Sequence, residues 1–317
     1  MGVDYDVDLA VIGSGGAAMS AAIAASQAGK SVVLVERGVL GGTCVNIGCV
    51  PSKTLLAAAG ARHAALTNPF KGAPTSAAPV NLGDLVAQKD ALIERLRDAK
   101  YADVAAAYGF QVRPGQASFL DGDTLAVDGQ ALRARAYLVA TGATPAIPEV
   151  VGLDSVDRLT STTAMQLTEL PESLVVIGGG YVGMEQAQLF ARLGSKVTVI
   201  ARSRLTSGEE PEISAAIEAV FADEHIAVLT AATVEKVLAG GGHKLVSVRT
   251  RAGVSELRAE HVLVATGRRP NTAGLGLEAV GVGVDGRGAV IVDDRQRTGN
   301  ARIWAAGDVA GGPQFVY

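Results

Sequence analysis

The chain has 317 residues, which is long for a single apolar core and predicts two domains. Hydrophobic residues make up 48% and charged residues 19%, a composition that excludes an intrinsically disordered chain. The net charge of −4 and the aromatic content of 4% argue against nucleic acid as a partner. The sequence has no run of eighteen apolar residues, and 1–8 holds acids rather than a basic leader. We therefore predict a cytoplasmic protein that does not enter a membrane.

The first predicted element is a mostly apolar strand over 7–12, followed by a glycine turn and a helix of small residues. A second apolar strand covers 31–36. This order predicts a βαβ unit that binds a dinucleotide, because the tight turn brings the helix N-terminus to a pyrophosphate. The residues expected at the phosphates are Gly13, Gly15, Gly16, Ala17 and Ala18.

Both cysteines of the chain fall in one glycine-rich segment, Gly41–Lys53. Cytosolic cysteines this close together are usually catalytic or bind a metal. On an ideal helix the Cα atoms of Cys44 and Cys49 would be about 8–9 Å apart, whereas a disulfide needs less than about 7 Å. A bridge between them therefore requires a distorted segment, which Gly48 makes possible. The four histidines lie far apart and have no metal-ligand spacing.

The middle of the chain contains a predicted loop over 69–79 and a predicted helix over 81–108. Two short strands, 137–142 and 261–267, both end in Ala-Thr-Gly and are both followed shortly by a proline. This repetition indicates a duplicated architecture.

A second strand, glycine turn and helix begins 165 positions after the first, with the turn at 178–183 and the next strand at 196–200. Two copies predict an α/β fold with two Rossmann-like dinucleotide-binding domains. The predicted boundaries are 1–149 for a first, FAD-binding part, 150–271 for an NADPH-binding domain and 272–317 for a return to the first domain.

The residue that ends each second strand predicts which nucleotide is bound. Glu36 stands 23 positions after Gly13 and would accept hydrogen bonds from ribose hydroxyls, as in FAD. The same spacing from Gly178 reaches an alanine that is followed by Arg202 and Arg204, which would suit the 2′-phosphate of NADPH. In the alternative reading, the two arginines are solvated surface residues.

The segment Gly41–Lys53 resembles the redox-active disulfide motif of the class I pyridine nucleotide-disulfide oxidoreductases, an FAD-dependent family. The glycine turns, the Ala-Thr-Gly strand ends and Ala306-Gly307-Asp308 extend this resemblance over the whole chain. The ending Pro-Gln-Phe-Val-Tyr is most similar to the mercuric reductase branch of that family.

The resemblance implies roles for five residues. Cys44 would be the outer thiol that meets substrate, Cys49 would lie against the flavin, and both would bind Hg(II) as substrate. Lys53 would lie beside the flavin with Glu185 as its ion-pair partner, and Tyr181 would cover the nicotinamide pocket. The predicted flavin contacts also include Glu36, Gly38, Gly42, Thr43, Ala117, Thr141, Gly142, Asp308 and Val316. The predicted contacts of the nicotinamide nucleotide include Gly178, Gly180, Val182, Arg202, Arg204 and Gly267.

The implied activity passes electrons from NADPH through FAD to the cysteine pair and on to Hg(II), giving Hg(0). Two alternatives stay open: a disulfide reductase similar to dihydrolipoamide dehydrogenase or glutathione reductase, and a non-catalytic flavin-binding module. Family members continue past this point with an interface domain that builds a homodimer. The resemblance therefore implies a truncated chain that lacks this domain, and a homodimer for the complete protein.

Overall fold

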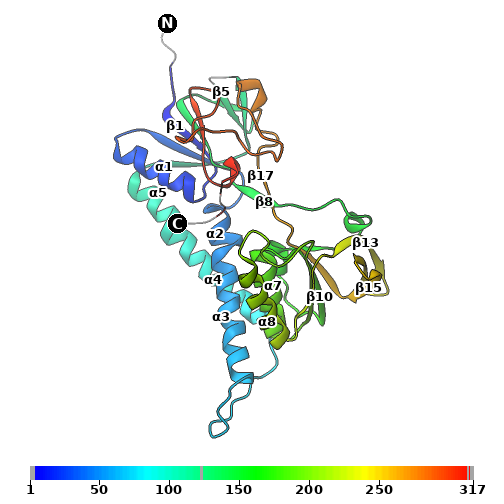
Figure 1. Cartoon of the computed structure of the whole chain (residues 1–317). Coiled ribbons are helices and arrows are strands. Elements are labelled where there is room, and N and C mark those ends of the chain that lie inside the picture. Colours follow the sequence, from blue (N-terminus) through cyan, green and yellow to red (C-terminus); the bar gives the residue numbers. More distant parts are fainter. Residues whose placement is uncertain (1–3, 122–123, 313, 315–317) are drawn as a thin grey trace. The chain divides into compact units, whose positions relative to one another are not determined.

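The computed structural model describes residues 4–121, 124–312 and 314, and its contacts divide the chain into two units (Figure 1). The first unit combines Met1–Cys49, Leu92–Thr144 and Arg268–Tyr317, and the second combines Val50–Ala91 and Pro145–Gly267. The chain therefore leaves the first unit twice and returns to it twice.

The first unit is built on a five-stranded parallel sheet with the strand order β18-β7-β1-β2-β3. Its strands are β1 (Val7–Ile12), β2 (Val32–Glu36), β3 (Gln111–Pro114), β7 (Ala134–Val139) and β18 (Ile303–Ala305). β1 lies at the centre, with Ile12 opposite Val35 on one side and Val139 on the other. The carboxyl ends of these three strands meet at one edge, where open α/β sheets bind nucleotides.

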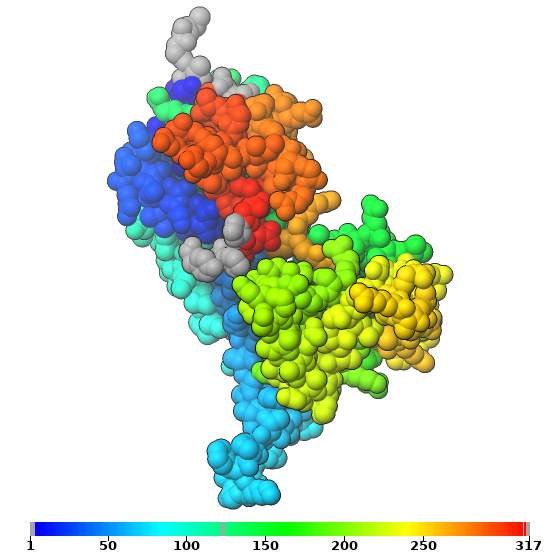
Figure 2. Space-filling model, in the orientation of Figure 1, coloured from blue at the N-terminus to red at the C-terminus, as the bar shows by residue number. Residues whose placement is uncertain are grey.

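Apolar side chains cover both faces of this sheet. On one face, helix α1 (Gly16–Gln27) shares an apolar cluster with β1 through Ala18 and Val11. On the other face, Phe119 and Tyr137 meet edge to face with their ring centres 5.3 Å apart. Figure 2 shows the orange and red return segment lying against the blue beginning of the same unit.

Smaller elements complete the first unit. Helix α2 covers Gly42–Ile47, and an antiparallel sheet contains β4 (Ala117–Asp121), β5 (Thr124–Val127) and β6 (Gln130–Leu132). Strands β8 (Ala143–Pro145) and β17 (Arg268–Pro270) pair with each other, and 3₁₀ turns cover Glu278–Val280 and Asp308–Ala310.

The second unit repeats the plan with the parallel strand order β12-β11-β10-β16-β9. Its strands are β9 (Leu159–Thr160), β10 (Ser173–Ile177), β11 (Lys196–Ile200), β12 (Ala227–Leu229) and β16 (His261–Val264). An antiparallel sheet of β13 (Thr233–Gly240), β14 (His243–Thr250) and β15 (Gly253–Ala259) belongs to the same unit, as does a 3₁₀ turn over Leu153–Ser155.

The second sheet is also buried on both faces. On one face, Leu55 and Phe190 share an apolar cluster with Val176 of β10. On the other face, Val175 of β10 shares a cluster with Val246 of β14. The helices of this unit are α3 (Cys49–Leu66), the first part of α4 (Leu82–Arg97), α6 (Ser161–Ala164), α7 (Tyr181–Leu193) and α8 (Pro211–Asp223). Among the described residues, no helix combines the length and apolar character that a membrane crossing requires.

The helix predicted over 81–108 is present, with one irregularity that the sequence did not reveal. Helix α4 passes through a π-helical turn, Asp98–Ala102, into α5 (Asp103–Tyr108). Such turns insert an extra residue and often occur at functional sites. The predicted loop over 69–79 contains neither helix nor strand.

The predicted α/β class with two Rossmann-like parallel sheets is confirmed. The contact division differs from the predicted domains at 50–91, because α3 and part of α4 pack into the apolar cluster of the second unit. The assignment of one nucleotide to each predicted domain stays a prediction.

Replacing Gly183 by alanine should destabilise the second unit. A Cβ atom there would lie 2.1 Å from the carbonyl oxygen of Gly178, and such overpacking costs about 1–3 kcal/mol. Gly180→Ala is the matched control, since an added Cβ at Gly180 meets nothing within 4 Å. Urea unfolding measures both variants, and equal free energies of unfolding would contradict the prediction.

Candidate active site

The first glycine turn brings three chain segments so close together that only glycine fits. Gly13 has φ of 111°, and a Cβ atom there would lie 2.3 Å from the carbonyl oxygen of Ala140. Gly42 has φ of 66°, and its Cβ atom would lie 2.6 Å from Cα of Gly15. Gly15 precedes α1 without a side-chain cap, so the first N–H groups of that helix have no side-chain acceptor there. This turn can therefore cradle an anion.

Glu36 lies at the end of β2 and is held in place by two donors. Its Oε2 accepts a hydrogen bond of 2.6 Å from Ser14 Oγ, and its Oε1 accepts one of 2.8 Å from the backbone N–H of Gly38. Gly13, Glu36, Ala117 and Thr141, all predicted cofactor contacts, line one pocket of the first unit. The lining of the pocket thus combines a carboxylate with the glycine turn.

Asn271 also lines this pocket, and the sequence reasoning missed it. The Asn271 side chain donates from Nδ2 to the backbone carbonyl oxygen of Thr141 over 2.8 Å. The backbone carbonyl oxygen of Asn271 accepts from Thr141 Oγ1 over 2.7 Å. The only signal in the sequence is its place after Arg-Arg-Pro, just past the second Ala-Thr-Gly.

Asp308 lies beside a partly buried arginine, Arg268, that the sequence did not predict. Arg268 Nε is 3.6 Å from Asp308 Oδ2, and its Nη2 donates to the carbonyl oxygen of Ala143 and to Thr43 Oγ1. Burial lowers the pKa of Arg268, and the charge of Asp308 opposes this shift. Within the described part of the chain, the buried Nε has no hydrogen-bond partner.

These features fit FAD as the group bound by the first unit. The glycine turn has room for a pyrophosphate, Glu36 can bind ribose hydroxyls, and the orphaned Nε of Arg268 offers a donor next to Asp308. Of the other predicted contacts, Gly16 and Ala17 begin α1, and Gly142 follows Thr141 at the pocket. Val316 lies outside the described residues.

The two cysteines stand on either side of a break between helices. α2 ends at Ile47, Gly48 has a non-helical conformation with φ of −126° and ψ of −109°, and α3 begins at Cys49. A Cβ atom on Gly48 would lie 3.0 Å from the carbonyl oxygen of Thr43. The expected distortion between the cysteines is therefore present, and it lies at the expected glycine.

Cys44 is half-buried, Cys49 is exposed, and the two side chains are hydrogen-bonded to each other. Burial, followed by the hydrogen bond and charge of Cys49, raises the pKa of Cys44 to about 11. Cys44 therefore favours the neutral thiol more strongly than an ordinary cysteine does. Burial, followed by the charges of both cysteines, raises the pKa of Tyr101, which lies on the π-helical turn. No sequence pattern had singled out Tyr101.

In the second unit, the structure brings Lys53 and Glu185 together as an ion pair. Lys53 lies at the start of the second turn of α3, four residues after Cys49. Glu185 lies near the start of α7. Residues four apart on a helix share a face, so the ammonium group and the Cys49 side chain project from the same side of α3.

The second glycine turn has the geometry of the first. Gly178 has φ of 128°, and a Cβ atom there would lie 2.2 Å from the carbonyl oxygen of Ala265. Gly180 precedes α7 without a side-chain cap, and the exposed side chains of Tyr181 and Val182 begin that helix. Gly267 follows β16 at the same edge of the sheet.

The loop after β11 holds the two predicted arginines and connects to Tyr181. Arg202 and Arg204 are exposed. Arg204 donates to the backbone carbonyl of Glu209, whose carboxylate accepts from the hydroxyl of Tyr181 and raises the pKa of that phenol. Glu209 was not predicted, because nothing in the sequence indicates which loop residue folds back onto the helix. An uncapped helix start next to exposed arginines fits a phosphorylated nucleotide such as NADPH.

The family model of the pyridine nucleotide-disulphide oxidoreductases matches residues 7–317. The chain is 54% identical to a mercuric reductase of Streptomyces lividans, over 98% of this chain and 67% of that protein. It is 47% identical to a mercuric reductase of Staphylococcus aureus, over 99% of this chain and 58% of that protein. A solved HOCl-induced flavoprotein disulfide reductase of Escherichia coli, in complex with Cu(II), has a TM-score of 0.86 at 31% identity, covering 97% of this chain and 67% of that one. The chain thus spans 67% and 58% of the length of these two curated relatives.

The raised pKa of Cys44 predicts how the reduced protein responds to alkali. The folded protein favours the thiol more than the unfolded chain does, so this contribution to stability is present below the ordinary thiol pKa and is lost as the pH rises toward about 11. The free energy of unfolding should fall over this pH range. In Cys44→Ser it should fall less, because the contribution of the Cys44 thiol is absent. Urea unfolding between pH 8 and pH 11 tests it; parallel curves for both proteins would count against it.

Proposed function

The chain belongs to the pyridine nucleotide-disulphide oxidoreductase family, as its sequence predicted, and on this premise we propose that it is the electron-transfer part of a mercuric reductase. In this proposal electrons pass from NADPH through FAD to Cys44 and Cys49, and from there to Hg(II), which leaves as Hg(0). The observation that carries the proposal is the hydrogen-bonded cysteine pair at the Gly48 break. The proposal is supported by two relatives, both mercuric reductases, of whose length this chain spans 67% and 58%.

When bound, FAD would take a hydride equivalent from NADPH and deliver an electron pair to the cysteine disulfide. The chain's own residues have the remaining tasks. The glycine turns at Gly13 and Gly178 would hold the two pyrophosphates. Lys53, paired with Glu185, would place a positive charge beside the flavin.

The cysteine pair also supplies the chemistry for the metal substrate. Two thiolates bind soft, thiophilic ions strongly, and Hg(II) is such an ion. Reduction of Hg(II) to Hg(0) consumes one electron pair, which is what one NADPH supplies. In the alternative reading, Cys44 would exchange with an organic disulfide instead. A flavin-binding module without activity would need neither the cysteine pair nor the Lys53–Glu185 pair.

The remaining parts of the proposal concern the complete protein. We infer a homodimer, on the family resemblance, and a cytoplasmic location, where NADPH is regenerated. Metal turnover by the complete-length protein tests the substrate: NADPH oxidation that depends on Hg(II) and releases volatile mercury supports the proposal. Faster turnover of lipoamide or glutathione disulfide would favour the alternative.

The complete protein should prefer NADPH over NADH by at least about tenfold in kcat/KM, or about 1.4 kcal/mol. Ala201 stands where NAD-binding sites have an acid, and Arg202 and Arg204 are exposed next to it. Arg202→Ala should reduce the preference, while Arg251→Ala, an exposed arginine on another turn of the same unit, should not. Equal kcat/KM for both nucleotides in the parent protein would mean that the arginines are surface charges.

The two cysteines should differ in their effect on the absorption spectrum. If Cys49 lies against the flavin, the two-electron-reduced complete protein should show a broad long-wavelength charge-transfer band. Cys44→Ala should keep this band without added reductant, and Cys49→Ala should lose it while FAD stays bound. The opposite pattern would reverse the two roles, and absence of the band in all three proteins would refute the redox proposal.

A further inference from the structure

The ion pair between Lys53 and Glu185 cannot fix its own geometry. The two side chains are 60% and 39% exposed, so water competes for both charges. Exposed pairs of this kind contribute little to stability, with a median near 0–1 kcal/mol. Something else must hold α3 and α7 at the spacing that keeps the two groups in contact.

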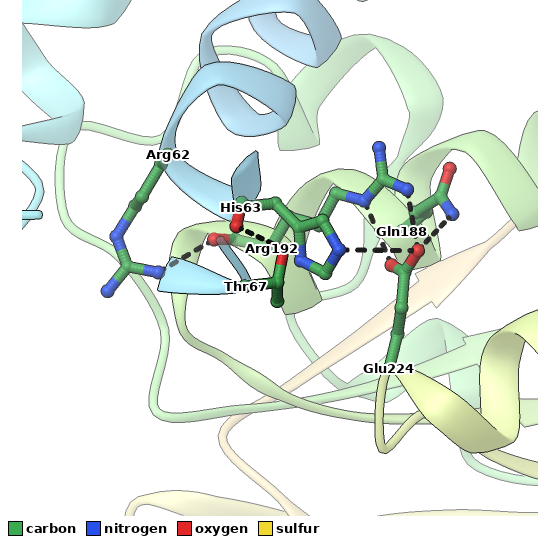
Figure 3. A network of polar contacts seen from close by, with 6 residues as sticks. All are labelled: Arg62, His63, Thr67, Gln188, Arg192 and Glu224. Atoms are coloured by element: carbon green, nitrogen blue, oxygen red, sulfur yellow. Dashed lines mark hydrogen bonds and ion pairs between the residues drawn. The ribbon is translucent and has the colours of Figure 1, made fainter. Parts of the chain in front are cut away.

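A second, more buried set of polar contacts ties the same two helices together farther along (Figure 3). Its centre is Glu224, whose side chain is only 9% exposed. Arg192 Nε donates to Glu224 Oε2 over 2.9 Å, Arg192 Nη2 donates to Oε1 over 2.5 Å, and Gln188 Nε2 donates to Oε1 over 3.0 Å. Glu224 directly follows α8, so its carboxylate joins the end of that helix to α7.

Helix α3 enters this set through two neighbouring residues. Arg62 Nη1 donates to the carbonyl oxygen of Arg192 over 2.8 Å, and His63 Nε2 lies 4.0 Å from Glu224 Oε1. Thr67 Oγ1 donates to the carbonyl oxygen of His63 over 2.8 Å. The end of α3 is therefore hydrogen-bonded to the end of α7 and lies against the residue that follows α8.

The charge of Glu224 is maintained despite its burial. Burial alone would raise the pKa of Glu224, but the hydrogen bond and charge of Arg192, with the charge of His63 and the hydrogen bond of Gln188, outweigh it and lower the pKa. A bidentate guanidinium–carboxylate contact of this kind also fixes orientation, because both groups are planar.

The helical spacing connects this set of contacts to the ion pair. On α7, Glu185, Gln188 and Arg192 lie three and seven residues apart and share one face. Lys53 and His63 are separated by about 15 Å along α3, and Glu185 and Arg192 by about 10 Å along α7. Between the two polar ties, Leu55 and Phe190 belong to one apolar cluster.

We propose that Glu224 is a positioning residue: with Arg192 and Arg62 it holds α3 against α7 so that Lys53 stays paired with Glu185 at the other end of the two helices. The proposal rests on the proposed function for its consequence, because the paired lysine is the cation expected beside the flavin. A buried carboxylate at the far end of two helices would thereby influence the redox centre without touching it.

Two substitutions test the proposal in the complete, FAD-loaded protein at one fixed pH. Glu224→Gln removes the central charge, and Arg62→Met removes the tie from α3 to Arg192 while keeping an apolar stem, in case the first variant does not fold. Both should keep FAD bound, lose at least about half of the long-wavelength charge-transfer absorbance and lower kcat by about tenfold, with KM for NADPH unchanged. The exchanged pair Arg192→Glu with Glu224→Arg should restore part of the loss.

Control variants separate positioning from general destabilisation. Val246→Ala creates a cavity in the apolar cluster on the other face of the same sheet and should lower stability while keeping the band. Arg249→Met breaks an exposed ion pair to Glu235 in the same unit and should change neither the stability nor the charge-transfer band. If Glu224→Gln and Arg62→Met melt at a lower temperature but keep the parent band and kcat, the proposal is wrong.

Crystal structures of the parent and the Glu224→Gln variant give a second answer that does not depend on the flavin. The proposal expects Lys53 and Glu185 to separate beyond ion-pair distance in the variant, and an intact pair would overturn it. If the parent itself shows no charge-transfer band, the redox function fails, and these structures still decide the positioning role.

Discussion

The close contact between a glycine turn and a neighbouring strand end is the constraint on which both units depend. At Gly13 and again at Gly178 the chain passes so near to a carbonyl oxygen, of Ala140 and of Ala265, that no Cβ atom would fit. This contact fixes where each helix begins relative to its sheet. The uncapped N–H groups of α1 and α7 then point to the sheet edge at which the strand ends converge.

Much of the fold could be predicted because its signals are local. A glycine turn, an Ala-Thr-Gly strand end and a continuous apolar strand each depend on a few adjacent residues. The residues that were missed act over long distances: Arg268 reaches Asp308, Asn271 reaches Thr141, and Glu209 reaches back to Tyr181. Such contacts depend on packing, which periodicity in one chain does not reveal.

Helix α3 shows how the local and the long-range levels meet in the candidate site. Its first residue, Cys49, is grouped with the first unit, while the rest of the helix packs in the second. The Gly48 break sets how the two cysteine side chains approach each other. In our proposal, the polar contacts around Glu224 set where Lys53 lies. The chemistry proposed for the cysteines therefore draws on residues that no motif contains.

The two glycine turns differ in the size of the residue that the following helix can hold against the turn. The first copy carries a buried Ala18 on its helix, while at the corresponding place of the second copy Gly183 has no room for a methyl group. Each copy therefore has its own helix spacing, and the helix of the first could not replace that of the second, because a methyl group at position 183 would meet the carbonyl oxygen of Gly178. The strand-end positions are fitted to their own copies in the same way: Glu36 accepts hydrogen bonds from Ser14 and Gly38, whereas Ala201 is buried next to Gly179.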